Sequence, residues 1–114
     1  MDVSELIETH VRIPSGKVLL DGDLVIPPGA KGIVVFVHGS GSSRKSVRNR
    51  YVAGVINQRG TATLLFDLLT PDEESVDMYT RHLRFDIGLL AGRLLDTIDW
   101  LAKMPETKGL KVGL

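Results

Sequence analysis

The sequence contains no cysteine among its 114 residues. Disulfides and thiolate metal sites are therefore excluded, and the composition fits a reducing compartment. An excess of charge of one sign is also lacking, because 14 basic residues balance 14 acidic ones. No global field would steer such a chain toward nucleic acid or an acidic membrane surface, so any basic site must be local.

Long apolar runs are absent as well. The longest wholly apolar run covers residues 33–37, and the leucine-rich stretch around Leu90 is interrupted by Arg93. Neither run is long enough to cross a bilayer. The first five residues are acidic rather than basic and lead into no apolar segment, which argues against a secretory signal. We therefore expect a cytoplasmic protein with no nucleic-acid and no membrane partner.

The residues that are present suit one globular domain, with 43% hydrophobic and 25% charged positions. Two β-type runs, residues 8–13 and 17–26, are joined by Pro14-Ser15-Gly16. This pattern predicts an antiparallel hairpin with a three-residue connection. Pro27-Pro28-Gly29 then ends the second run, because proline lacks the N–H that a strand ladder needs.

The next segment predicts a parallel βαβ unit. Residues 33–37 are continuously apolar, as in a strand buried on both faces of a sheet. Residues 61–67 predict a second buried strand. Between them, residues 47–59 carry apolar side chains at the spacing of one helical stripe, with Gly60 as the expected C-cap. The stripe consists of Val47, Tyr51, Val52, Val55 and Ile56.

The third part of the chain predicts an acidic surface loop and a long helix. Residues 68–84 contain Thr-Pro-Asp-Glu-Glu and predict a loop with at most a short helical turn. Residues 86–103 predict a helix that begins at an Asp86 cap and ends before Pro105. Its apolar stripe is Ile87, Leu90, Leu94, Ile98 and Leu101.

Two further expectations concern the long helix and the last four residues. Gly88 and Gly92 lie one helical turn apart, and we expect them to let the long helix approach the sheet closely. Residues 111–114 predict the opening of a third parallel strand. If the sheet is doubly wound, the helices at 47–59 and 86–103 cover opposite faces of it.

A glycine-rich loop, His38-Gly39-Ser40-Gly41, follows the apolar run 33–37. A buried strand that ends in this loop, with a helix, a strand and a long amphipathic helix after it, resembles the α/β-hydrolases and most of all the dienelactone hydrolase family. The resemblance implies an α/β fold with three α/β/α layers, in which an antiparallel hairpin precedes parallel βαβ units. Residues 1–114 would then be a single partial domain, truncated before the nucleophile elbow.

The family resemblance also implies a chemistry, hydrolysis of a carboxylic ester or lactone. In acyl transfer an oxyanion forms that needs backbone N–H donors already aimed at it. The match assigns the first donor to the Ser40 amide, with Gly41 as its neighbour, and gives His38 and Gly39 a supporting role in the loop. Nucleophile, acid and base lie beyond Leu114 in the family's order, so the chain alone is expected to be inactive. No cofactor and no metal is implied.

No other residue is expected to supply the missing catalytic groups. Ser42 and Ser43 lack the strained G-x-S-x-G elbow of an activated nucleophile, and turn or helix-cap roles suit them better. Asp67 ends a strand and is expected to brace a loop. His10 and His82 have no carboxylate or second histidine at metal-ligand spacing in the sequence, so neither receives a function.

A basic cluster, Arg44, Lys45, Arg48 and Arg50, straddles the start of the helix at 47–59, where the helix dipole disfavours cations. Something should compensate for these charges. An anionic ester or lactone would do so through Arg44 and Arg48, as dienelactone-like substrates carry a carboxylate. Pairing with local acids or plain exposure to solvent is the competing interpretation.

Two other functions stay open at this point. The loop at residues 39–46 could bind an anion such as phosphate at a helix N-terminus, although it lacks the Walker and G-x-G-x-x-G patterns. The chain could also be a non-catalytic assembly module. The strand at 33–37 would present an edge on the side of the incomplete third strand, which predicts a homo-oligomer or a complementing C-terminal fragment that pairs there.

Overall fold

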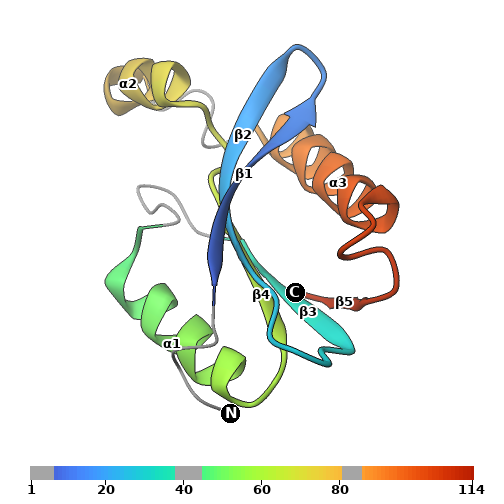
Figure 1. Cartoon of the computed structure of the whole chain (residues 1–114). Coiled ribbons are helices and arrows are strands. Elements are labelled where there is room, and N and C mark those ends of the chain that lie inside the picture. Colours follow the sequence, from blue (N-terminus) through green and yellow to red (C-terminus); the bar gives the residue numbers. More distant parts are fainter. Residues whose placement is uncertain (1–6, 38–44, 81–85) are drawn as a thin grey trace.

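The computed structural model describes residues 7–37, 45–80 and 86–114. Five strands form one mixed sheet in the order β1-β2-β4-β3-β5, and three helices pack around it (Figure 1). The elements are β1 (Glu8–Ser15), β2 (Val18–Val25), β3 (Gly32–Phe36), α1 (Val47–Gln58), β4 (Ala62–Phe66), α2 (Pro71–Thr80), α3 (Ile87–Lys103) and β5 (Lys111–Gly113). The α/β architecture predicted from the sequence is confirmed.

The N-terminal hairpin is antiparallel, as predicted, but its connection is shorter. Ser15 pairs with Val18, so only Gly16 and Lys17 connect the two strands. Pro14 remains in β1 because β1 is an edge strand, where the missing proline N–H costs no ladder bond. Gly16 has φ 58°, the left-handed conformation that a two-residue hairpin turn requires.

The parallel part of the sheet follows the predicted βαβ path. β3 pairs in parallel with β4, and β5 pairs in parallel with the other side of β3. β4 also pairs antiparallel with β2, which joins the hairpin to the parallel strands. All five residues of β4 are buried, but β3 is buried only at Ile33 and Val35. The expectation of burial on both faces therefore holds for β4 and is wrong for β3.

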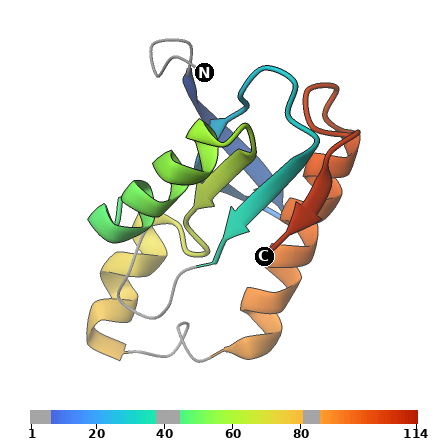
Figure 2. The ribbon, with the colours of Figure 1, turned by 90° about the horizontal axis from the view of Figure 1, so that it is seen from below.

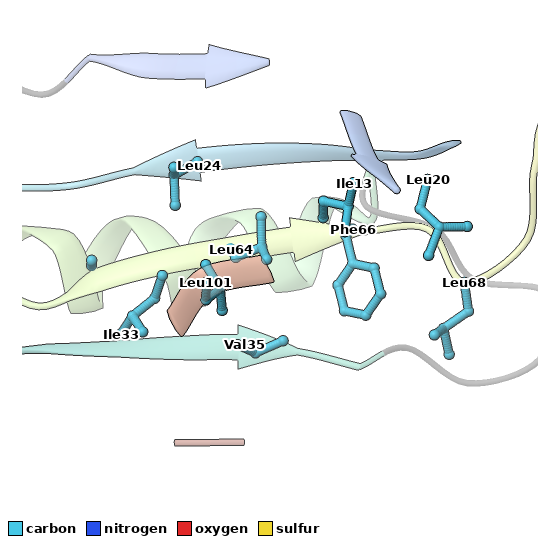
Figure 3. Packing of buried hydrophobic residues seen from close by; sticks show 10 residues of the cluster. Ile13, Leu20, Leu24, Ile33, Val35, Leu64, Phe66, Leu68 and Leu101 are labelled. Atoms are coloured by element: carbon cyan, nitrogen blue, oxygen red, sulfur yellow. The ribbon is translucent and has the colours of Figure 1, made fainter. Parts of the chain in front are cut away.

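α1 and α3 lie on opposite faces of the sheet, as the hydrolase winding predicts (Figures 1 and 2). The apolar core lies on the α3 face, where Leu101 packs with side chains of β3 and β4 (Figure 3). Full burial of each large apolar side chain contributes roughly 1.5–3 kcal/mol. The core residues are Ile13, Leu20, Leu24, Ile33, Val35, Ala62, Leu64, Phe66, Leu68 and Leu101.

The start of α3 is capped as predicted, because Asp86 Oδ1 accepts the Leu89 N–H at 3.0 Å. Two expectations about this helix are wrong. Ile87 is 72% exposed, since the inward face is formed instead by Leu90, Arg93, Leu94, Thr97 and Leu101. A Cβ at Gly88 would meet only Asp86, and one at Gly92 would meet nothing within 4 Å, so neither glycine is required by contact with the sheet.

α1 ends as predicted, with Gly60 at φ 88° after the Arg59 C-cap. Its predicted apolar stripe does not face the sheet, because Val47 and Tyr51 are 84% and 73% exposed. The inward residues are Ala53 and Asn57. Asn57 donates a hydrogen bond to Thr63 of β4 beneath the helix, so this buried polar side chain is paired.

The segment after β4 is not the predicted loop but contains the ten-residue helix α2. Thr70 and Glu73 form a reciprocal capping box: the Thr70 N–H donates to Glu73 Oε1 at 2.9 Å, and the Glu73 N–H donates to Thr70 Oγ1 at 3.2 Å. Pro71 occupies the first helical position, where its missing N–H has no helical partner to lose. The acidic run stabilises the positive end of the helix dipole.

Candidate functional site

The carboxyl ends of the parallel strands define the candidate site. β3 and β4 run in the same direction, with Phe36 beside Leu65, so the chain leaves both strands at one edge of the sheet. β5 runs in that direction too. In open α/β sheets, ligands bind outside this edge. The segment with the glycine-rich loop connects β3 to α1 here.

The predicted residues of this loop, His38, Gly39, Ser40, Gly41 and Arg44, lie outside the described residues, as do Ser42, Ser43 and His82. Described chain resumes at Lys45. Ser46 is the N-cap of α1, and its Oγ accepts the Asn49 N–H at 3.4 Å. Arg48 lies exposed on the first turn of α1.

Arg50, the last member of the basic cluster, is held by local acids. Its guanidinium donates to Glu8 Oε2 at 2.7 Å and to Asp23 Oδ2 at 3.1 Å. The hydrogen bond to Glu8 raises the pKa of Arg50, so the cation is permanent. The competing interpretation of the cluster, pairing with local acids, therefore holds for Arg50, and this side chain ties α1 to β1 and β2.

Buried polar contacts fix the chain where it leaves β4. The Asp67 N–H donates to the Asp21 carbonyl at 2.9 Å, which ties this turn to β2. Arg93 of α3 donates to the Leu68 carbonyl at 2.8 Å. It also donates to both oxygens of Glu73, at 2.6 and 2.7 Å. α2 is thus joined to α3 through a bidentate ion pair at the candidate site's edge.

This ion pair is mostly shielded from water, because the Arg93 and Glu73 side chains are 7% and 23% exposed. The hydrogen bond from Arg93 lowers the pKa of Glu73, and the Thr70 backbone N–H acts in the same direction. Glu73 therefore stays ionised to a lower pH than an ordinary glutamate. Sequence reasoning missed the pair, although the Thr70-x-x-Glu73 spacing and an arginine within an apolar helix face both signalled it.

His10 has carboxylate neighbours that the sequence interpretation did not expect. Its Nε2 lies 3.3 Å from Asp21 Oδ1, and its Nδ1 lies 3.4 Å from Asp23 Oδ1. Pairing of the two strands brings these groups together, since His10 and Asp23 are register partners 13 residues apart. His10 thus belongs to a polar cluster that also contains Asp21, Asp23 and Arg50, on the α1 face of the hairpin.

The described residues do not contain a catalytic constellation of their own. Ser15 donates to Asp96 Oδ2 at 2.6 Å, and Ser46 caps a helix, so among residues 7–37, 45–80 and 86–114 no serine is hydrogen-bonded to a histidine. No cluster of three or more histidine, aspartate or glutamate side chains suited to a metal occurs in those ranges. Within the same ranges, no helix is long and apolar enough to span a bilayer.

Comparison with solved structures assigns the fold. No family model matches the sequence. The esterase Est1E from Butyrivibrio proteoclasticus superimposes with a TM-score of 0.70 at 16% identity, over 90% of this chain and 39% of that one. At this identity the likeness concerns the fold alone. The superposition, the strand order and the placement of the helices agree with one another. Together they define the N-terminal part of an α/β-hydrolase fold.

The likeness is much stronger for one particular hydrolase. Dienelactone hydrolase from Anabaena variabilis has 61% sequence identity and a TM-score of 0.93, over 96% of this chain and 50% of that one. This chain is therefore similar to the N-terminal half of a dienelactone hydrolase, as the glycine-rich loop after β3 predicts.

Two curated proteins of Mycobacterium tuberculosis, from different strains, are 54% identical over 108 residues. Both are provisionally named phosphoribosyl transferases. The match covers 95% of this chain but 24% of each of those proteins. The chain thus spans about a quarter of the curated relatives and half of the Anabaena hydrolase.

Proposed function

We propose that this chain forms part of an α/β-hydrolase that cleaves a carboxylic ester or lactone, and that it supplies the oxyanion-binding loop. The observation that carries the proposal is the 61% identity to a dienelactone hydrolase over a sheet with a TM-score of 0.93. At that identity, the segment after β3 would serve the same purpose in both proteins. The sequence His38-Gly39-Ser40-Gly41 suits that purpose, because glycines let backbone N–H groups approach a ligand.

Each candidate residue receives a distinct role in this proposal. The Ser40 N–H, with that of Gly41 beside it, donates to the oxyanion of the tetrahedral intermediate. His38 and Gly39 hold the loop in shape. Arg44 and Arg48 attract the carboxylate of an anionic substrate to the start of α1. The attacking group, the acid and the base are supplied by polypeptide that this chain does not contain.

Packing and hydrogen bonds next to the carboxyl ends of β3 and β4 support the proposal. β4 is fully buried, and Arg93 fixes both the turn after it and α2. Electrostatic stabilisation of an oxyanion requires donors that stay in place during the reaction, and well-packed neighbouring elements favour this. Phosphoribosyl transfer is not proposed for this chain, because it covers only 24% of the two proteins with that name.

A chimera tests the function. In it, this chain replaces the matching half of the Anabaena dienelactone hydrolase, and turnover of p-nitrophenyl acetate is measured against the Anabaena protein. We expect clear hydrolysis by the chimera and none by the 114-residue chain alone, above a denatured-protein control. A chimera that folds, as judged by circular dichroism, yet hydrolyses nothing would contradict the proposal.

We also propose that a complementing fragment pairs with the β5 edge. β5 is three residues long and pairs with β3 only at residues 32–34, and Val112 and Leu114 are exposed. Among the described residues, Val35 and Phe36 of β3 therefore have no strand partner on the β5 side. A strand from another polypeptide could pair there. The remaining half of the Anabaena hydrolase, added in trans, should co-elute with this chain, and separate elution would contradict the pairing.

A further inference from the structure

The turn that follows β4 lies at the edge of the sheet where the chain also leaves β3. Phe36 at the end of β3 is the register partner of Leu65, so β4 ends one residue past β3 in the same direction. β3 lies between β4 and β5. A substrate held outside the end of β3 therefore has residues 67–70 as its neighbour on the side away from β5. We call residues 67–70 the β4 turn.

The side chain of Arg93 holds the β4 turn from the α3 face of the sheet. Its guanidinium donates to the Leu68 carbonyl at 2.8 Å and to both oxygens of Glu73, at 2.6 and 2.7 Å. α2 lies on the side of the sheet that carries α1, whereas α3 covers the other side (Figures 1 and 2). The guanidinium therefore joins the two sides past the end of β4, at the edge where the candidate site lies.

Stability alone does not account for an ion pair at this place. Arg93 is buried on the face of α3 that also carries Leu90, Leu94 and Leu101. Withdrawal of two charges from water costs free energy, and apolar side chains of similar size are often as stabilising as a shielded ion pair. A planar guanidinium supplies direction instead, because its donors fix the Leu68 carbonyl and the Glu73 carboxylate in one geometry.

We propose that Arg93 is a positioning residue that limits the size of the ester the hydrolase accepts. It touches no reacting atom and acts by holding the β4 turn as a fixed wall beside the substrate. Without the guanidinium, the turn yields to a larger acyl or leaving group, so discrimination against bulky esters falls. This inference rests on the proposed hydrolase function and adds to it a determinant of substrate size.

Ester selectivity of the chimera with the Anabaena hydrolase tests this role. The substrates are p-nitrophenyl acetate, p-nitrophenyl hexanoate with a longer acyl chain, and naphthyl acetate with a larger leaving group. The variant is Arg93→Met/Glu73→Gln, which removes the guanidinium without leaving an unpaired carboxylate. For at least one bulky ester, kcat/KM relative to p-nitrophenyl acetate should rise by about fivefold or more. A change in the fraction of folded enzyme cancels in this ratio, so a loss of stability alone does not move it.

Two control variants separate positioning from general loosening of the fold. Glu73→Gln alone keeps Arg93 and a side-chain oxygen that accepts from it, so its selectivity should stay close to that of the parent chimera. Asn57→Ala removes the donor to the Thr61 carbonyl, which precedes β4 at the opposite edge of the sheet, and should leave the ratios unchanged. Circular dichroism checks the fold of each variant. An equal shift in Asn57→Ala would contradict the role of Arg93.

Hydrogen exchange in the same chimeras gives a readout that does not depend on turnover. Amides of the β4 turn should exchange about tenfold faster in Arg93→Met/Glu73→Gln than in the parent, and at the parent rate in Glu73→Gln. Unchanged exchange, or unchanged ratios in an active chimera, would overturn the inference. A folded chimera that cleaves none of the three esters contradicts the proposed function and the selectivity with it, whereas exchange still reports whether Arg93 holds the turn.

Discussion

The two faces of the sheet are packed by different chemistry. Under α3, apolar side chains of four strands meet Leu101 in a continuous core (Figure 3). Under α1, Asn57 donates to the Thr61 carbonyl and to Thr63 Oγ1, both at 3.0 Å. A pocket of about 230 Å³ remains beside these groups, lined by Glu8, Val25, Arg50, Ala53, Gly54, Asn57, Thr63 and Leu65.

This difference indicates where the fold gains its stability. Burial of apolar area is the main favourable term in folding, whereas hydrogen bonds and exposed ion pairs contribute about 1 kcal/mol or less each. The α3 face should therefore dominate the free energy of unfolding. The α1 face holds the helix that follows the glycine-rich segment through specific polar contacts, and we expect it to tolerate change more easily.

The largest effect is expected from Phe66→Ala on the α3 face. Phe66 is fully buried at the end of β4, so its truncation removes apolar burial and leaves a cavity. The free energy of unfolding should fall by about 3–5 kcal/mol in urea titration. Leu19→Ala, in β2 but 49% exposed, should cost less than about 1 kcal/mol. Equal losses from the two variants would contradict the account of the core.

Arg93→Met should have the next largest effect. It removes the bidentate partner of Glu73 and the donor to the Leu68 carbonyl, leaving both acceptors poorly paired. We expect a loss of about 2–3 kcal/mol, below the value for a fully buried pair because Glu73 is partly exposed. Changing Glu73→Gln in addition should recover part of the loss in the same titration.

The pH dependence of the free energy of unfolding provides a control for the Arg93→Met variant. Arg93 lowers the pKa of Glu73 in the folded state below its ordinary value of 4.5. The stabilisation is therefore fully present above about pH 4.5 and is lost as pH falls through the depressed folded pKa. The difference between wild type and Arg93→Met should shrink over that acid window. A difference independent of pH would mean that Glu73 is not the group that Arg93 stabilises.

A smaller loss is expected from Asn57→Ala on the α1 face. The change leaves the Thr61 carbonyl and the Thr63 hydroxyl without their donor and should cost about 1–2 kcal/mol by thermal or urea unfolding. Gln58→Ala, the exposed neighbour on the same helix, should be nearly neutral. A loss from Asn57→Ala as large as that from Phe66→Ala would show that the faces contribute equally.

The smallest expected effect is a gain in stability from Gly54→Ala. A Cβ at this position of α1 would meet nothing within 4 Å, and glycine costs helix propensity. Unfolding free energy should rise by about 0.5–1 kcal/mol. Gly60→Ala should do the opposite, because its φ of 88° disfavours any side chain. A loss from Gly54→Ala would mean that the α1 face is packed more tightly than this pocket implies.

Local patterns in the sequence predicted the elements with strong periodicity or clear caps. The hairpin, the β3-α1-β4 unit and α3 with its Asp86 cap all follow from signals within a few residues. The start of α2 carries the same kind of signal, the capping box of Thr70 and Glu73. The acidic, turn-like composition of residues 68–84 nevertheless predicts a loop.

Non-local contacts could not be predicted in this way. Val47 and Tyr51 of α1 are exposed, whereas Asn57 is buried and donates to Thr63 of β4, a contact that the helix sequence alone does not indicate. The carboxylates beside His10 come from strand register. For the candidate site, the motif predicts the glycine-rich loop, whereas the hydrogen bond from Arg93 to the Leu68 carbonyl joins residues 25 positions apart in sequence and has no local signal.

The central claim, that the loop after β3 supplies an oxyanion donor, is tested most directly by comparing Ser40→Pro with Ser40→Ala in the chimera with the Anabaena hydrolase. Proline removes the backbone N–H, whereas alanine keeps it and removes only the hydroxyl. The account predicts that Ser40→Pro lowers kcat by about 100- to 1000-fold while Ser40→Ala stays close to the parent chimera. Equal kcat values for two folded variants would contradict the claim.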